Sequence, residues 1–143
     1  MNRANLTKEY LGFEVRPTGH LLLLMPIRPP EKVGSIFLSY DSQDSIQAQQ
    51  EICLVLAMGD NAYRQDGVGA ELFANGPFCQ VGDWVDTNQY EKHPKKWRHL
   101  PKLLCYYVND TRVLGTYSDE DVEKALGLKL TADQIREDMK QKG

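Results

Sequence analysis

Residues 19–26 read Gly-His-Leu-Leu-Leu-Leu-Met-Pro, and this stretch decides the fold class. Five apolar residues follow one another between breaking residues, so the run has the length of a strand and not of a typical helix. Apolar and polar side chains do not alternate in it, which predicts a strand that is buried on both faces. Pro26, Pro29 and Pro30 then end regular pairing or confine it to a sheet edge.

Further strand and turn signals follow this run. Glu51–Met58 is a second apolar stretch, and the turn signal Gly59-Asp60-Asn61 comes directly after it. Residues 61–77 contain several glycines, which predicts a hairpin or a long loop. The pair Gly82-Asp83 predicts a tight turn, and we expect a strand to begin at Trp84.

A β-hairpin is predicted nearer the C-terminus. Cys105–Val108 and Arg112–Gly115 have the composition of strands and flank Asn109-Asp110, a favourable turn pair. Several short strands joined by many turns indicate an all-β fold. We therefore expect a small, irregular β-barrel.

The end of the chain has a helical pattern. Ser118 with Asp121 three residues later is typical of a helix start, and Thr131 with Gln134 repeats this spacing. The sequence thus predicts two short C-terminal helices. Together with the barrel, they give three regions: an N-terminal extension over residues 1–12, a barrel over 13–117 and a helical tail over 118–143.

The composition limits the classes of partner. The 143 residues include 17 Lys and Arg against 20 Asp and Glu, a formal net charge of −3, so nucleic acid is not an expected partner. No apolar run approaches the ~20 residues of a membrane span, and the first ten residues lack the apolar stretch of a signal peptide. We expect a single cytoplasmic domain with its own core and no membrane contact.

No catalytic pattern stands out in the sequence. The three cysteines, Cys53, Cys79 and Cys105, are odd in number and form no CxxC pair, which predicts free thiols in the core. The sequence contains no nucleophile elbow, P-loop or dinucleotide-binding glycine motif. We therefore expect neither an enzyme nor a cofactor or metal site.

An apolar triplet stands out in a polar stretch. Ile36, Phe37 and Leu38 lie within residues 31–50, whose second half is rich in Ser, Gln and Asp and has the composition of a flexible loop. Three large apolar side chains in such a loop would be exposed to water. We expect them to dock on a partner.

A basic run provides a second candidate contact surface. Trp97 and His99 lie within it, and residues 92–102 contain no acid. Basic and aromatic side chains together can bind phosphate backbones by charge and stacking, although a solvated loop or a subunit contact is the more ordinary interpretation. The basic residues are Lys92, Lys95, Lys96, Arg98 and Lys102.

Five stretches, taken in order, resemble the GroES-like co-chaperonins. They are an Arg-Pro turn followed by an apolar strand, a small-residue pair followed by three apolar residues, a strand closing on a glycine turn, a Val-Gly-Asp element and a C-terminal strand with an acidic ending. These stretches are Val15–Met25, Val33–Leu38, Ile52–Gly59, Val81–Val85 and Asp110–Val122. The resemblance therefore covers roughly residues 13–122.

The resemblance implies a GroES-like barrel assembled as a homo-oligomeric ring of seven subunits, which caps a chaperonin cage. It identifies Val33–Leu38 as the mobile-loop motif, with Ile36, Phe37 and Leu38 docking in a groove of the chaperonin and Gly34 supplying the turn. Residues 61–77 would form the roof. One such loop binds weakly, because the entropy lost when the loop becomes ordered offsets much of the free energy gained by burying its apolar side chains. Several loops on one ring together bind tightly.

Departures from the family pattern suggest an alternative. The first strand lacks charged alternation, residues 86–104 hold the basic insertion, and both ends extend beyond the family core. Diverged and elongated members are typical of tailed phages, which implies a phage-encoded protein in the host cytoplasm. The alternative is a virion structural protein on the same fold, a capsid decoration or neck component whose partner is the major capsid or neck protein.

Overall fold

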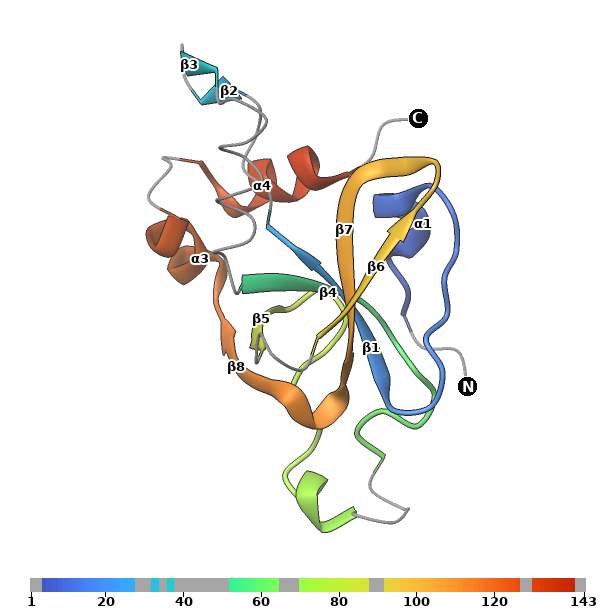
Figure 1. Ribbon diagram of the computed structural model, residues 1–143. Helices are drawn as coiled ribbons and strands as arrows, with labels where there is room; N and C mark the ends of the chain where they lie inside the picture. Colours follow the sequence, from blue (N-terminus) through green and yellow to red (C-terminus); the bar gives the residue numbers. More distant parts are fainter. Residues whose placement is uncertain are drawn as a thin grey trace.

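A six-stranded antiparallel sheet dominates the structure (Figure 1). The computed structural model describes residues 4–27, 32–33, 36–37, 52–64, 70–87, 92–126 and 130–140. The strands run in the order β6-β7-β1-β4-β5-β8, and β2 and β3 form a separate two-stranded sheet. The strands are β1 (Leu21–Pro26), β2 (Lys32–Val33), β3 (Ile36–Phe37), β4 (Ile52–Met58), β5 (Trp84–Thr87), β6 (His93–Trp97), β7 (Leu100–Asn109) and β8 (Val113–Tyr117).

The two apolar runs form strands, as predicted, and the structure places them next to each other at the centre of the sheet. β1 pairs with β4 on one side and with β7 on the other. Successive side chains of a strand point to opposite faces. Leu23 and Met25 accordingly enter one core cluster, whereas Leu22 and Leu24 enter a second cluster across the sheet. The run needs no polar alternation because both faces of β1 are covered.

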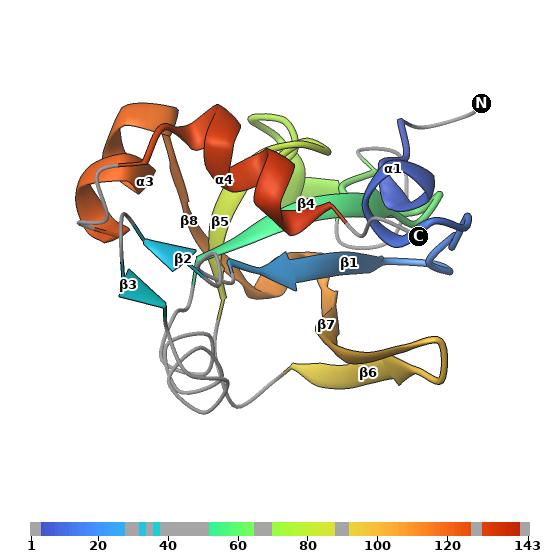
Figure 2. The same cartoon turned by 90° about the horizontal axis from the view of Figure 1, so that it is seen from above.

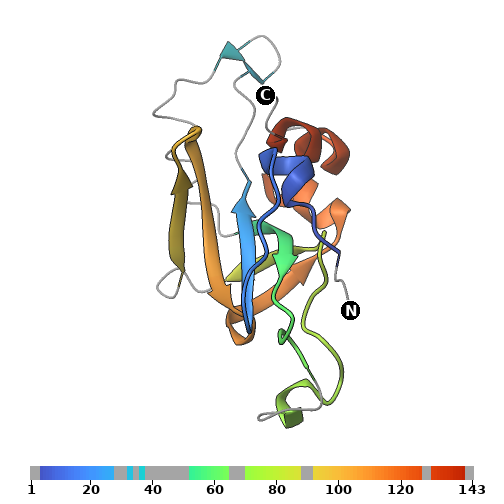
Figure 3. The same ribbon diagram turned by 90° about the vertical axis from the view of Figure 1, so that its right-hand side faces the viewer.

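Three helices cover one face of the sheet (Figures 2 and 3). They are α1 (Thr7–Leu11), α3 (Asp119–Leu126) and α4 (Ala132–Met139). Tyr10, Val122, Ile135 and Met139 are buried in the same cluster as Leu23. Apolar side chains from both ends of the chain therefore complete the core on this face.

The two C-terminal helices begin where the sequence predicts. The Ser118 hydroxyl accepts a hydrogen bond from the backbone N–H of Asp121 at 3.2 Å. Thr131 and Gln134 form a reciprocal capping box at the start of α4. Local hydrogen-bonding groups alone mark these helix starts, which is why the sequence reveals them.

The helix α1 is not foreseen by the sequence. Its five residues are too short to show a period, and contacts with distant residues hold it. The backbone N–H of Leu6 donates to the carbonyl of Leu56 at 2.8 Å, and Asn5 forms an isolated bridge with Ala57. Gly12, with φ of 87°, ends the helix in the left-handed conformation.

A long loop and an aromatic cluster cover part of the other face. Within residues 61–64 and 70–77 the chain forms turns and the 3₁₀ helix η1 (Ala70–Phe73), so the loop prediction is right and the described residues contain no hairpin there. The rings of Tyr63, Phe73 and Phe78 contact one another, with centroids 5.2–5.4 Å apart. Tyr63 and Phe73 belong to the second core cluster.

The predicted hairpin of Cys105–Val108 with Arg112–Gly115 is wrong. β7 pairs with β1 and β6, whereas β8 pairs with β5. The 3₁₀ helix η3 (Asp110–Arg112) joins β7 to β8. The carboxylate of Asp110 is buried and accepts a hydrogen bond from the backbone N–H of Tyr63 at 2.9 Å. Because Asp110 bonds to a distant segment, the turn does not close a local hairpin.

The short η3 connection requires the sheet to curl. β7 and β8 are four strand spacings apart in the sheet order, which would be about 19 Å in a flat sheet. The backbone from Asn109 to Val113 spans at most about 14 Å when fully extended, and less in a 3₁₀ turn. The sheet therefore bends toward itself at this end.

The fold is β-rich and antiparallel, as the sequence predicts, but the sheet does not close into a barrel in the described part of the chain. β6 and β8 each have one neighbouring strand and form its two edges. Among the described residues, no helix is long and apolar enough to cross a membrane.

Gly59 provides a test of this packing. A Cβ at position 59 would clash with the backbone carbonyl of Gly19, whereas a Cβ at Gly115 would meet no atom within 4 Å. We expect Gly59→Ala to lower the free energy of unfolding by about 1–3 kcal/mol, because the obstructing atom is backbone and cannot turn aside. Gly115→Ala is the matched control and should be close to neutral. Urea unfolding measures both, and equal stability of the two variants would contradict the close approach.

Candidate functional site

The apolar motif contributes a small hairpin of its own. Lys32 pairs with Phe37, and Val33 pairs with Ile36, between β2 and β3. Gly34 and Leu38, the other two predicted contact residues, lie outside the described residues. Figures 1 and 3 place the hairpin beyond the C-terminal end of β1, outside the six-stranded sheet.

The basic run forms an edge of the main sheet. Lys95 and Lys96 lie in β6, Arg98 lies in the turn after it, and all three side chains are exposed. Lys92 is half-buried just before β6, and Lys102 contributes its backbone to β7. The basic run therefore forms one hairpin, β6–β7, and Figures 1 and 3 show it apart from the β2–β3 hairpin.

Aromatic rings pack along this basic hairpin and at its turn. The Phe13 ring lies 5.4 Å from Trp97 and 4.7 Å from His99, measured between ring centroids. The Lys95 ammonium lies 6.0 Å from the Trp97 ring centroid, and the Lys92 ammonium lies 5.0 Å from that of Tyr106. Trp97 is half-buried in this cluster.

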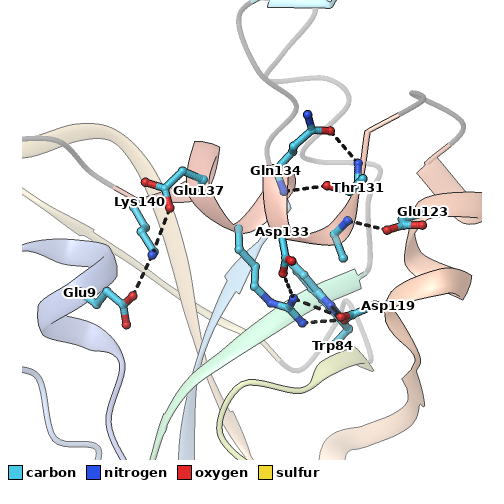
Figure 4. Close-up of polar contacts among 11 residues, drawn as sticks. Glu9, Trp84, Asp119, Glu123, Thr131, Asp133, Gln134, Glu137 and Lys140 are labelled. Carbon is cyan, nitrogen blue, oxygen red and sulfur yellow. Dashed lines mark hydrogen bonds and ion pairs between the residues drawn. The ribbon is translucent and has the colours of Figure 1, made fainter.

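A polar cluster that the sequence analysis did not identify joins α4 to the sheet (Figure 4). The Trp84 indole N–H donates to Asp119 Oδ1 at 2.9 Å. The Arg136 guanidinium donates to both carboxylate oxygens of Asp119, at 2.6 and 3.2 Å, and to Asp133 at 3.1 Å. It also lies over the Trp84 ring, 5.0 Å from the ring centroid. We call Trp84, Asp119, Asp133 and Arg136 the α4 clamp.

The clamp shifts the pKa values of both charged partners in the direction of a stable ion pair. Hydrogen bonds from Arg136, assisted by the Trp84 N–H, lower the pKa of Asp119 below its usual value. The same ion pair raises the pKa of Arg136. Trp84 is buried, at 1% exposed, so the clamp fixes α4 against a rigid ring at the edge of the core.

A second anchor holds the other end of α4. The Lys140 ammonium lies 2.8 Å from Glu9 on α1 and 3.2 Å from Glu137 on its own helix. It also lies 5.6 Å from the Tyr10 ring centroid. Hydrogen bonds to Glu9 and Glu137 raise the pKa of Lys140 to about 12. The anchor joins α4 to α1, as Figure 4 shows.

A third cluster surrounds Asp110. His20 Nδ1 lies 3.2 Å from its carboxylate, and the Tyr63 hydroxyl donates to its backbone carbonyl at 2.6 Å. Tyr63 has φ of 57°, an unusual conformation for a residue other than glycine, and its two hydrogen bonds to Asp110 hold it there. This cluster joins three segments of the chain.

All three cysteines are buried, as predicted, and none of them forms a disulfide bond in the described part of the chain. Burial raises the pKa of Cys79 to about 11 and that of Cys105 to about 12. Both side chains are therefore neutral thiols near pH 7, whereas a nucleophilic cysteine acts as a thiolate. Among the described residues, no group of three or more His, Cys, Asp and Glu side chains is arranged to hold a metal ion.

Comparisons with protein-family models and with curated proteins find no match to this chain. The function must therefore be argued from the residues and their placement. The clamp and the Asp110 cluster position elements of the fold. The two hairpins present exposed or projecting segments from which a partner-binding surface can be built.

The α4 clamp gives a prediction about stability. Arg136→Ala removes the contacts with Asp119 and with the Trp84 ring, and we expect it to lower the free energy of unfolding by about 1–2 kcal/mol. Arg136→Lys keeps the charge but loses the planar fork, so it should recover only part of this. Chemical unfolding monitored by Trp fluorescence measures both. Full recovery by lysine would mean that charge alone holds α4.

The same cluster predicts a pH dependence. Because the pKa of Asp119 is lowered in the folded state, its ion pair stabilises the fold above about pH 4 and loses this effect as the pH falls through the folded pKa. We expect Asp119→Asn to be less stable than the wild type at pH 7, with the difference narrowing below pH 4. Unfolding curves from pH 7 to pH 3 measure this. A difference that stays constant with pH would contradict it.

Proposed function

We propose that this chain is a GroES-like co-chaperonin, a lid that caps a chaperonin cage through residues 33–38. The observation that carries the proposal is the β2–β3 hairpin. It follows the central strand β1 and lies outside the six-stranded sheet, with Ile36 and Phe37 forming its second strand (Figures 1 and 3). In this proposal, the apolar strand is the segment that docks on the partner.

The order of elements supports the proposal. The first motif ends in β1, the third is β4 with its Gly59 turn, and the fourth is the Gly82-Asp83 turn with the start of β5. The fifth motif runs through η3 and β8 into α3. Stretches that resemble the family thus fall on strands and turns in the same order, around one antiparallel sheet.

The energetics suit a removable lid. Burying a large apolar side chain contributes roughly 1.5–3 kcal/mol, and ordering a polar loop opposes much of that gain. Each copy then binds weakly, and several copies on one homo-oligomeric ring bind tightly through a high effective concentration. The proposed partner is a host or phage chaperonin ring, and the proposed location is the cytoplasm.

The placement of the chain ends favours the lid over the virion alternative. A capsid decoration or neck protein would use the two terminal extensions to hold neighbouring subunits. In the described residues, Tyr10 of α1 and Ile135 of α4 are instead buried in the core of their own chain, and Lys140 joins the two helices. These residues stabilise the subunit itself.

The apolar motif is tested by mixing the protein with a bacterial double-ring chaperonin, with and without ATP, and separating the complexes by size. We expect the wild type to co-elute in a nucleotide-dependent way. Phe37→Asp should keep the folded state and the oligomer but lose co-elution, because an aspartate opposes burial in an apolar groove. Far-UV circular dichroism monitors the fold.

Leu72→Asp is the matched control, since Leu72 is 58% exposed on η1, away from the motif. It should bind the chaperonin like the wild type. Unfolding of the isolated protein by Phe37→Asp would show that Phe37 is a core residue. If the well-folded wild type does not co-elute with the chaperonin, the lid proposal is contradicted. The virion alternative would then be tested by looking for this chain in purified virus particles.

A further inference from the structure

The edge strand β6 is protected against pairing with another strand. Pro94 has no backbone N–H to donate, and Lys95 and Lys96 add two exposed charges next to it. Prolines and lysines on an edge strand hinder the addition of a further strand. A partner of this edge therefore meets its side chains and not its backbone.

The charges of this edge are not neutralised within the described chain. Lys95, Lys96 and Arg98 are exposed, and no carboxylate of the described residues forms an ion pair with them. Phe13 packs against Trp97 at the turn of the hairpin, next to Arg98, which fixes this end of the hairpin on the rest of the chain. The hairpin thus presents a concentrated positive surface on a protein of net charge −3.

A complementary surface lies beyond the opposite edge strand, β8. The first turn of α3 follows β8 directly and carries Asp119, Glu120 and Asp121. Asp119 forms an ion pair with Arg136, whereas Glu120 and Asp121 are exposed and form no ion pair with a described cation. Two carboxylates thus remain on this edge for a basic partner.

The two surfaces lie on different sides of one molecule. β6 and β8 are the two ends of the sheet order, and Figures 1 and 3 draw the β6–β7 hairpin and α3 on different sides. A contact between them therefore requires a second copy. Such a contact joins two different patches, and repetition of a head-to-tail contact closes into a ring when the rotation permits.

We propose that the β6–β7 hairpin of one copy binds the first turn of α3 of the next copy, with Lys95, Lys96 and Arg98 facing Glu120 and Asp121. This proposal rests on the proposed function, because a lid that binds through several weak loops requires several linked copies. The contact provides the multivalent lid with a charge-based subunit interface. Nucleic acid is the other polyanion that the basic hairpin could bind, and the test separates the two.

The test measures the oligomeric state by sedimentation velocity, without chaperonin, at low and high salt. We expect a wild-type oligomer that dissociates as salt screens the contact. Lys95→Glu with Lys96→Glu, and separately Glu120→Lys with Asp121→Lys, should each raise the dissociation constant at least about tenfold, because each pair of reversals replaces attraction with repulsion. Far-UV circular dichroism confirms that the variants fold.

The decisive variant combines all four reversals in one chain. It should assemble again, because the acidic hairpin of one copy now meets the basic first turn of α3 of the next copy. This expectation holds for a ring of any size. Lys8→Glu with Arg16→Glu changes the net charge of the chain by the same amount as the Lys95 and Lys96 pair and should leave assembly unchanged, because both residues are exposed and lie outside the two proposed surfaces.

Three results would overturn the proposal. The first is a monomeric wild type at about 100 µM, a concentration far above a micromolar Kd. The others are unaltered assembly of the reversed variants and failure of the fourfold variant to reassemble. If Lys95→Glu with Lys96→Glu assembles normally but loses binding to a single-stranded DNA probe, the hairpin is a nucleic-acid contact. The chaperonin experiment is separate, so a salt-sensitive oligomer that ignores chaperonin would leave this interface standing and remove the lid function.

Discussion

Only the three residues of η3 connect β7 to β8, although β1, β4 and β5 lie between these strands in the sheet. Asp110 holds this connection by bonding to the backbone of Tyr63 and to His20. The sheet therefore has to curl, with β1 and β4 at its centre and β6 and β8 at its edges. The helices then cover one face, and the β2–β3 hairpin lies outside the sheet (Figure 3).

Features determined by neighbouring residues were predictable from the sequence. The apolar runs identified β1 and β4, and the caps at Ser118 and Thr131 located α3 and α4. Features that depend on distant contacts were not. Asn109-Asp110 has the composition of a hairpin turn, but the partners of Asp110 are 47 and 90 residues away in the chain. The five-residue α1 has no period of its own and is held by tertiary contacts.

The same holds for the candidate surfaces. The apolar triplet and the basic run are each made of neighbouring residues, so the sequence reveals them. The positions of these runs in the fold depend on distant contacts, and the sequence does not reveal those positions. The sequence does not show that β6 is an edge strand or that Arg136 occupies Asp119 and leaves Glu120 and Asp121 exposed. Our two proposals rest on these positions: the apolar strand outside the sheet is proposed to dock in a groove, and the opposite charges on β6 and α3 are proposed to join two copies.

Hydrogen exchange with mass spectrometry tests the central claim, docking through residues 33–38, most directly. In the isolated protein we expect slow exchange in β4, which is buried along its whole length, and faster exchange in residues 33–38. Adding a double-ring chaperonin with ATP should protect residues 33–38 and leave β4 unchanged. Equal protection of both segments without chaperonin, or no added protection of residues 33–38 in its presence, would contradict the account.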